Sequence, residues 1–358
     1  AILGAAGGAY VLKILANAPS AGFKVRDFTW YQYFFTECRA IWSYLRLFAL
    51  PFGQNIDHDF PISRNLLQHG ALLGLIGLAG AIWAAWHYRD RYRLACFGFF
   101  VFLLLLAPTS SVVPILDPLV ERRLYLPVLG LLLILFDLLR RSSWGKVELS
   151  LSLALVLGVS AALTYQRTLL WSNPIALWRD AAEKAPRKAR THFWLAYSLL
   201  NANDCQGAVT EYQAAAKLLP LDVRHPTIIT AGLLENWGLA YRCAGLPKPA
   251  IEKLDQAARI RPTSKLYAQI GMMYGEVGDW KQATEFLQRA LTLDPNYERA
   301  YVYLGNLYLQ TKQPDEAARY YLQAVTLDPA DQYAANALVA ARYKSAEQKR
   351  QTPESSRR

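Results

Sequence analysis

The second half of the chain repeats a pattern of alanine and proline that constrains its fold more than any other feature. Alanine stands twelve and five residues before each of four prolines, which are Pro220, Pro262, Pro295 and Pro329. The prolines lie 42, 33 and 34 residues apart, so the period is close to 34 and the first junction carries about eight extra residues. Because alanine permits close helix contact and proline cannot continue a helix, each period predicts a tightly packed helix that then stops.

A second recurring pattern, of glycine followed by tyrosine, lies upstream in each complete period. Glycine and tyrosine, three residues apart, recur as Gly238 and Tyr241, Gly271 and Tyr274, and Gly305 and Tyr308. The glycine allows a first helix to approach the second helix closely, and the tyrosine fills the gap between neighbouring pairs. Paired helices with this period are typical of tetratricopeptide repeats, so we predict an all-α solenoid.

The repeats divide the chain into three predicted parts. Residues 1–170 form a separate domain, residues 171–344 form the solenoid, and residues 345–358 form a basic tail that we expect to be disordered. The predicted units of the solenoid are a half-repeat at 171–186, repeats at about 189–222, 231–263, 264–297 and 298–331, and a capping helix at 331–344.

The first helices of such an array line a face that binds extended polypeptide. The side chains predicted for this groove are Arg190, Phe193, Tyr197, Glu235, Arg242, Lys265, Met272, Arg299 and Asn306. The alternative interpretation is that these residues form a solvated surface.

Residues 1–170 consist mainly of apolar runs separated by short basic loops. The runs are Ala1–Leu15, Leu67–Trp86, Leu94–Pro108, Leu124–Leu139 and Val147–Thr164. A soluble domain of this size has too little interior to bury so many apolar helices, so we predict a transmembrane bundle of about five to six helices. The chain begins inside apolar sequence without methionine or a charged leader segment, and we expect further membrane helices upstream.

Basic loops predict the orientation of this bundle. Residues 87–93 and 140–146 are short and basic, which places them on the cytoplasmic side. Residues 51–65, residues 108–122 and the repeats then face outward, into the periplasm of a bacterium or the lumen of a eukaryote. We expect an integral protein of the bacterial inner membrane, with its repeat domain on the periplasmic side.

Composition excludes several classes of function. The net charge of +11 is spread along the chain without a basic stripe interleaved with aromatic residues, which argues against nucleic acid as a partner. Five scattered histidines and the absence of Walker, GxGxxG, HExxH and CxxC motifs argue against a nucleotide site or a zinc site. Cys205 and Cys243 lie near the turns of adjacent repeats. Two buried thiols are the favoured interpretation, and a disulfide is the alternative.

Two polar clusters in the first half are candidate sites. Polar residues within 29–50 share one helical face and include Arg39 and Arg46, which predicts a wall toward a lipid-linked phosphate or, equally, an interfacial helix. Asp57 and Asp59 flank His58 in an outward loop, where they are candidates for a divalent metal or a base. A solvated turn is the favoured interpretation of that loop.

A third cluster lies before the apolar run that starts at Leu124. Glu121, Arg122, Arg123 and Tyr125 gather at the predicted outer end of a span, where the two arginines break the charge rule. Planar guanidinium groups suit phosphate, so we predict a lipid-phosphate site here. The alternative is interfacial anchoring.

Three segments together resemble a known family. They are Glu121–Pro127, the stretch from Tyr165 to Arg190, and the stretch from Arg46 to Asp59. They are similar, in the same order, to the transmembrane and tetratricopeptide repeat-containing O-mannosyltransferases and their bacterial relatives. The resemblance implies a GT-C type membrane glycosyltransferase that moves a sugar from a polyprenyl-phosphate donor to a polypeptide acceptor.

The resemblance also implies a catalytic acidic residue in a first outer loop, and nothing in this chain corresponds to it. The catalytic base is therefore unknown, no cofactor is predicted beyond the possible divalent metal, and activity of this chain alone is an open question. The alternative function is a non-catalytic membrane scaffold whose repeats recruit partner proteins for envelope assembly or secretion.

Overall fold

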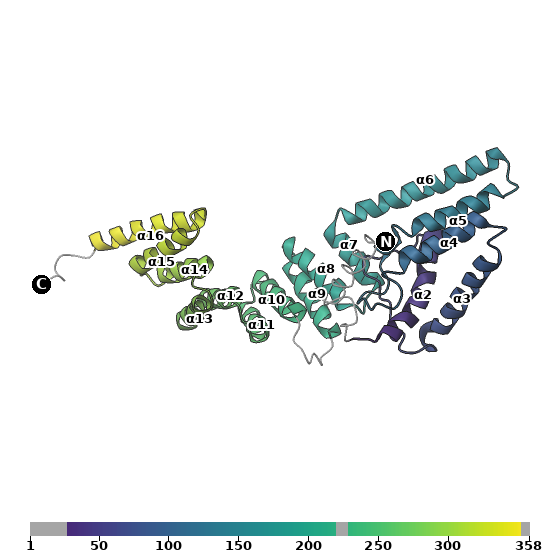
Figure 1. The fold of residues 1–358 in the computed structure, drawn as a ribbon. Helices are drawn as coiled ribbons and strands as arrows, with labels where there is room; N and C mark the ends of the chain where they lie inside the picture. Colours follow the sequence, from purple (N-terminus) through teal and green to yellow (C-terminus); the bar gives the residue numbers. More distant parts are fainter. Residues whose placement is uncertain (1–26, 220–227, 352–358) are drawn as a thin grey trace, which may run out of the picture. The chain divides into compact units, whose positions relative to one another are not determined.

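The computed structural model describes residues 27–219 and 228–351, and every regular element in those residues is a helix (Figure 1). The chain divides into two compact units that meet between Lys188 and Ala189. The predicted half-repeat at 171–186 therefore clusters with the first unit. The predicted apolar run Ala1–Leu15 lies outside the described residues.

The first unit contains, within its described residues, six α-helices and two short 3-10 helices. In chain order they are α2 (Trp30–Ala49), η1 (Gln68–Gly70), α3 (Ala71–His87), α4 (Arg93–Leu106), η2 (Glu121–Leu124), α5 (Val128–Arg140), α6 (Lys146–Trp171) and α7 (Pro174–Lys184). Residues 68–87 and α6 are long and apolar enough to cross a membrane by length and composition, with mean hydropathies of 1.5 and 1.9. α4 and α5 have 14 and 13 residues, which is about 20 Å of helix against a hydrocarbon core of about 30 Å. The multi-span bundle stays a prediction.

α6 exposes its apolar side chains. It buries no residue along its described length, and Leu151 and Leu155 are 66% and 68% exposed. An apolar helix of this length without a protein cover is typical of a helix that faces lipid or another chain.

α4 and α5 lie side by side and touch through two glycines (Figure 1). A Cβ atom at Gly98 would lie 2.5 Å from the carbonyl oxygen of Gly130, and a Cβ atom at Gly130 would lie 2.3 Å from the carbonyl oxygen of Gly98. The two backbones are therefore closer than any larger residue permits. Phe102 and Leu131 continue the contact as buried core residues.

α2 lies along the loop that follows α4, because both halves of the helix bond to that loop. The Tyr33 hydroxyl donates to the Thr109 carbonyl at 2.6 Å. Eleven residues further along α2, the Tyr44 hydroxyl accepts from the Val120 amide at 3.1 Å. The face of α2 that carries Tyr33 and Tyr44 thus packs against protein.

The second unit contains four helix pairs and a final helix within its described residues. The pairs are α8 (Ala189–Asn201) with α9 (Cys205–Leu218), α10 (Ile228–Cys243) with α11 (Pro247–Ile260), α12 (Ser264–Glu276) with α13 (Trp280–Leu293), and α14 (Glu298–Gln310) with α15 (Pro314–Leu327); α16 (Gln332–Gln351) follows. All eight alanines of the sequence pattern are fully buried. α11, α13 and α15 each end two residues before the proline of their period. The predicted solenoid is confirmed.

The glycines of the pattern make the helix pairs possible. Cβ atoms at Gly238, Gly271 and Gly305 would lie 2.8, 2.7 and 2.6 Å from side chains of the second helix in the same pair. Each first helix therefore approaches its partner at the position that the sequence reserves for a residue without a side chain.

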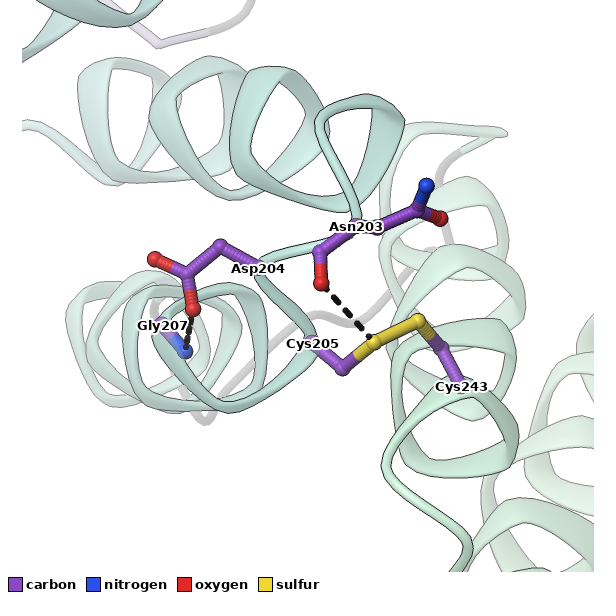
Figure 2. The surroundings of a disulfide bond; sticks show 5 residues. All are labelled: Asn203, Asp204, Cys205, Gly207 and Cys243. Carbon is purple, nitrogen blue, oxygen red and sulfur yellow. Dashed lines mark hydrogen bonds between the residues drawn. A yellow bond between two sulfur atoms is a disulfide. The ribbon is translucent and has the colours of Figure 1, made fainter.

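A disulfide joins Cys205, at the start of α9, to Cys243, at the end of α10 (Figure 2). The Asp204 side chain accepts from the Gly207 amide at 2.9 Å and caps α9, which fixes Cys205 in the first turn. The favoured prediction of two buried thiols was wrong, because the Cα atoms of the two residues lie 5.4 Å apart, within reach of a disulfide. Cys38 and Cys96 are buried free thiols.

α16 continues seven residues beyond the predicted end of the capping helix at 344. Ser345 donates to Asp315 at 2.5 Å, and Lys349 pairs with the same carboxylate at 2.9 Å. These two contacts hold the Ser345 and Lys349 turns against α15 and lower the pKa of Asp315 below its usual range. Only residues 352–358 of the predicted disordered tail lie outside the described residues.

Candidate functional site

The first helices of the array line a pocket of about 410 Å³, here called the groove pocket. Four predicted groove residues line it: Arg242 from α10, Met272 from α12, and Arg299 and Asn306 from α14. Tyr333, at the start of α16, also lines it. The periodic placement of one first helix beside the next thus brings Arg242 and Asn306 together, although they are 64 positions apart in the sequence.

Hydrogen bonds fix the orientation of Asn306 in this pocket. Its side-chain oxygen accepts from the Tyr321 hydroxyl at 2.6 Å and from the Tyr333 hydroxyl at 3.0 Å. Because both bonds go to the oxygen, the amide nitrogen keeps two N–H donors for another partner. Neither tyrosine was predicted as a site residue, since their roles depend on partners from other helices.

Charges in the groove pocket are partly paired. Arg242 bonds to Glu276 through two nitrogens, at 2.7 and 3.0 Å. Arg299 is exposed and makes no ion pair with any described residue. Burial and the neighbouring Asp331 raise the pKa of Glu298 above its usual range. The pocket therefore offers one unpaired guanidinium, an oriented amide and two adjacent carboxyl groups.

Five other predicted groove residues lie outside this pocket. Lys265 binds Glu235 at 2.6 Å and links α12 to α10. Arg190, Phe193 and Tyr197 lie on α8, where the Phe193 ring packs edge-on against Tyr212. Glu235 and Lys265 therefore form an ion pair that joins two neighbouring repeats.

The acidic loop of the first unit is ion-paired. Asp57 pairs with Lys188, and Asp59 bonds to Arg187 at 2.9 Å. His58 lies 2.9 Å from Glu121. Within residues 27–219 and 228–351, no group of three or more histidine, cysteine, aspartate and glutamate side chains is arranged to hold a metal ion. The contacts dock this loop onto the residues after α7.

Two of the predicted phosphate-binding arginines bond to protein instead. Arg39 donates to the Pro61 carbonyl at 3.0 Å and to Ser63 at 2.8 Å. Arg123 is largely buried and donates to three backbone carbonyls of the loop before η2, which are those of Thr109, Asp117 and Pro118. Both guanidinium groups hold loops in place. Arg46 is exposed on α2.

Arg122 and Tyr125 line a larger pocket of about 840 Å³, here called the Arg122 pocket. Its walls come from the end of α2, from η2, from the start of α5 and from α6. Glu121 also lines it, but its carboxylate accepts from the Asn55 amide at 2.6 Å as well as contacting His58. Arg122 is exposed and makes no ion pair with any described residue.

Arg167 is the second guanidinium of the Arg122 pocket, and it was not predicted as a site residue. One of its nitrogens lies 3.4 Å from Asp180, while Nη2 is buried without a hydrogen-bond partner among the described residues. The sequence signal that could have identified Arg167 is its position just after the apolar run 147–164, on the same predicted side of the membrane as Arg122.

The helix pairs and the groove pocket define a helical-repeat solenoid of the kind that presents a binding face. Two segments of the chain, residues 175–223 and residues 276–341, match models of the tetratricopeptide repeat. These two segments of the chain are therefore tetratricopeptide repeats. A search of curated proteins found no match.

Several solved structures are similar to part of the chain. A crystal structure of YrrB, described as a tetratricopeptide-repeat protein with an unusual peptide-binding site, is 17% identical, with a TM-score of 0.39, and covers 50% of this chain and 86% of its own. The tetratricopeptide-repeat protein TTC0263 from Thermus thermophilus is 23% identical, with a TM-score of 0.39, and the match covers 50% of this chain and 95% of TTC0263. MamA 41-end from Desulfovibrio magneticus RS-1 is 20% identical, with a TM-score of 0.40, and the match covers 47% of this chain and 92% of the MamA chain.

Proposed function

We propose that the chain is a membrane-tethered repeat protein that binds an extended polypeptide segment in its groove pocket, on the exoplasmic side of the membrane. The observation that carries the proposal is the pair formed by Asn306 and Arg299. These residues are seven positions apart on α14, so they lie on one face about 10 Å apart along the helix. An extended peptide covers that distance in about three residues.

The chemistry of the two residues favours a polypeptide. The free N–H donors of Asn306 suit a backbone carbonyl, and the unpaired Arg299 suits a carboxylate of the same segment. Met272 adds an adaptable apolar contact between them and Arg242.

Three features support the tether and its orientation. Residues 68–87 and α6 have the length and composition of membrane spans. The basic loops 87–93 and 140–146 favour the cytoplasmic side, which leaves the repeats outside. A disulfide between Cys205 and Cys243 is typical of an oxidising compartment such as the periplasm or the lumen.

Selection of peptides by the purified full chain in detergent tests the groove. We expect the selected peptides to lose about tenfold in affinity when Arg299→Ala or Asn306→Ala removes a bond to the ligand. Arg319→Ala is the matched control, because Arg319 lies on α15 and pairs only with Glu316 on the protein surface among the described residues. Equal affinity in the two groove variants and the control would contradict the proposal.

Sugar transfer to the bound polypeptide is a second candidate function. The observation in its favour is that the segment 121–127, which resembles the O-mannosyltransferase family, borders the Arg122 pocket. The acidic loop gives little support for a catalytic base, since both of its aspartates have basic partners. Incubation of the full chain with a polyprenyl-phosphate sugar and a selected peptide tests this function. A mass increase of one sugar on the peptide supports it, and an unchanged peptide mass contradicts it.

A further inference from the structure

We infer that the Arg122 pocket binds the phosphate headgroup of a bilayer phospholipid, with Arg122 and Arg167 as its two cationic contacts. The inference rests on the membrane tether of the proposed function and is independent of peptide binding by the repeats. Arg167 is therefore a phosphate contact in this account, whereas Arg39 and Arg123 are not.

The charges of the pocket favour an anion. Arg122 is an exposed guanidinium without an ion pair among the described residues, and the Arg167 Nη2 group is buried without a partner among them. A buried guanidinium nitrogen without a hydrogen bond is costly, and a phosphate oxygen satisfies it. Glu121 is the one acidic residue in the described lining, and its carboxylate already accepts the Asn55 amide and contacts His58.

The walls of the pocket favour an anion that carries hydrocarbon. Leu47 and Phe48 from the end of α2, Leu124, and Leu163 from α6 form its apolar side. The same helix α6 leaves its apolar surface uncovered along its described length. Acyl chains can therefore run from the pocket along α6, which a free phosphate or a soluble peptide does not require.

Aromatic residues place the pocket at the level of lipid headgroups. Tyr125 is 83% exposed and Trp171 is 53% exposed, and both line the pocket. Exposed tyrosine and tryptophan at the ends of apolar helices are typical of the membrane interface. Two arginines at that level suit the phosphate of a phospholipid rather than its hydrocarbon chains.

Native mass spectrometry of the detergent-solubilised full chain tests this inference with two lipid probes that share their acyl chains, and with inorganic phosphate and a prenyl phosphate as competitors. We expect phosphatidylglycerol to bind at least about tenfold more tightly than diacylglycerol, which lacks the phosphate. Arg122→Gln should reduce phosphatidylglycerol affinity about tenfold, and adding Arg167→Gln should reduce it further. Arg122→Gln removes no ion pair with the described residues, so the folded state should survive it. Arg64→Gln, at an exposed arginine in the loop before α3, is the matched control.

Four results would overturn the inference. They are equal affinity for the two probes, unchanged phosphatidylglycerol affinity in the double variant, displacement of the lipid by inorganic phosphate alone, and selective binding of a prenyl phosphate in place of phosphatidylglycerol. Extraction of membranes with alkaline carbonate distinguishes failure of the lipid site from failure of the membrane tether. A chain that resists extraction while its double variant binds lipid normally would refute the lipid site and leave the tether intact.

Discussion

Replacing Gly130 with alanine is expected to lower the stability of the first unit by about 3 kcal/mol, because the new methyl group has no space. Its Cβ would lie 2.3 Å from the carbonyl oxygen of Gly98 and 2.5 Å from the amide nitrogen of Phe102. Both neighbours are backbone atoms of α4, so the two helices must separate. Thermal unfolding of the detergent-solubilised chain measures the effect.

Gly158→Ala is the matched control for this prediction. Gly158 also lies in an apolar helix, but a Cβ there would meet no described atom within 4 Å. We expect this variant to unfold at the temperature of the unmodified chain or slightly above it, since alanine favours helix over glycine. Equal unfolding temperatures for Gly130→Ala and Gly158→Ala would show that α4 and α5 do not pack as described.

Removing the disulfide is expected to have the second large effect. The bond closes a segment of 38 residues between Cys205 and Cys243, for which the chain-entropy argument gives about 4 kcal/mol. The double variant Cys205→Ala, Cys243→Ala should therefore unfold at a clearly lower temperature than the oxidised protein. Reduction of the unmodified protein should produce a similar decrease.

The double variant also provides the control for the reduction experiment. A reductant should leave its unfolding temperature unchanged, because the remaining described cysteines, Cys38 and Cys96, are free thiols. If reduction changes the stability of the variant as much as that of the unmodified protein, the effect does not come from this bond. If neither treatment changes stability, the bond does not hold the first two repeats together.

The repeat fold was predictable because its signals are local. Each helix pair needs small residues at fixed positions, and the buried alanines and Gly238, Gly271 and Gly305 report those contacts directly in the sequence. The prolines report where the helices stop. The disulfide was harder to predict, since Cys205 begins the second helix of one pair and Cys243 ends the first helix of the next pair, so their proximity depends on how the two pairs stack.

Site residues were less predictable because their partners are distant in the sequence. Arg122 and Arg123 are adjacent, yet Arg122 lines a pocket while Arg123 donates to backbone carbonyls. Backbone carbonyls have no sequence signature, so composition alone does not separate the two arginines. Asp59 pairs with Arg187, which is 128 positions away, and a loop motif read by itself does not reveal such a partner.

Reporter fusions that locate the repeats test the proposed membrane tether and exoplasmic groove most directly. Alkaline phosphatase, which folds only in an oxidising compartment, is fused after Arg358 of the full chain in bacteria, and a fluorescent protein that folds in the cytoplasm is fused at the same point in a second strain. The account predicts an active phosphatase and a dark fluorescent protein. An inactive phosphatase together with a bright fluorescent protein would place the groove pocket in the cytoplasm and contradict the account.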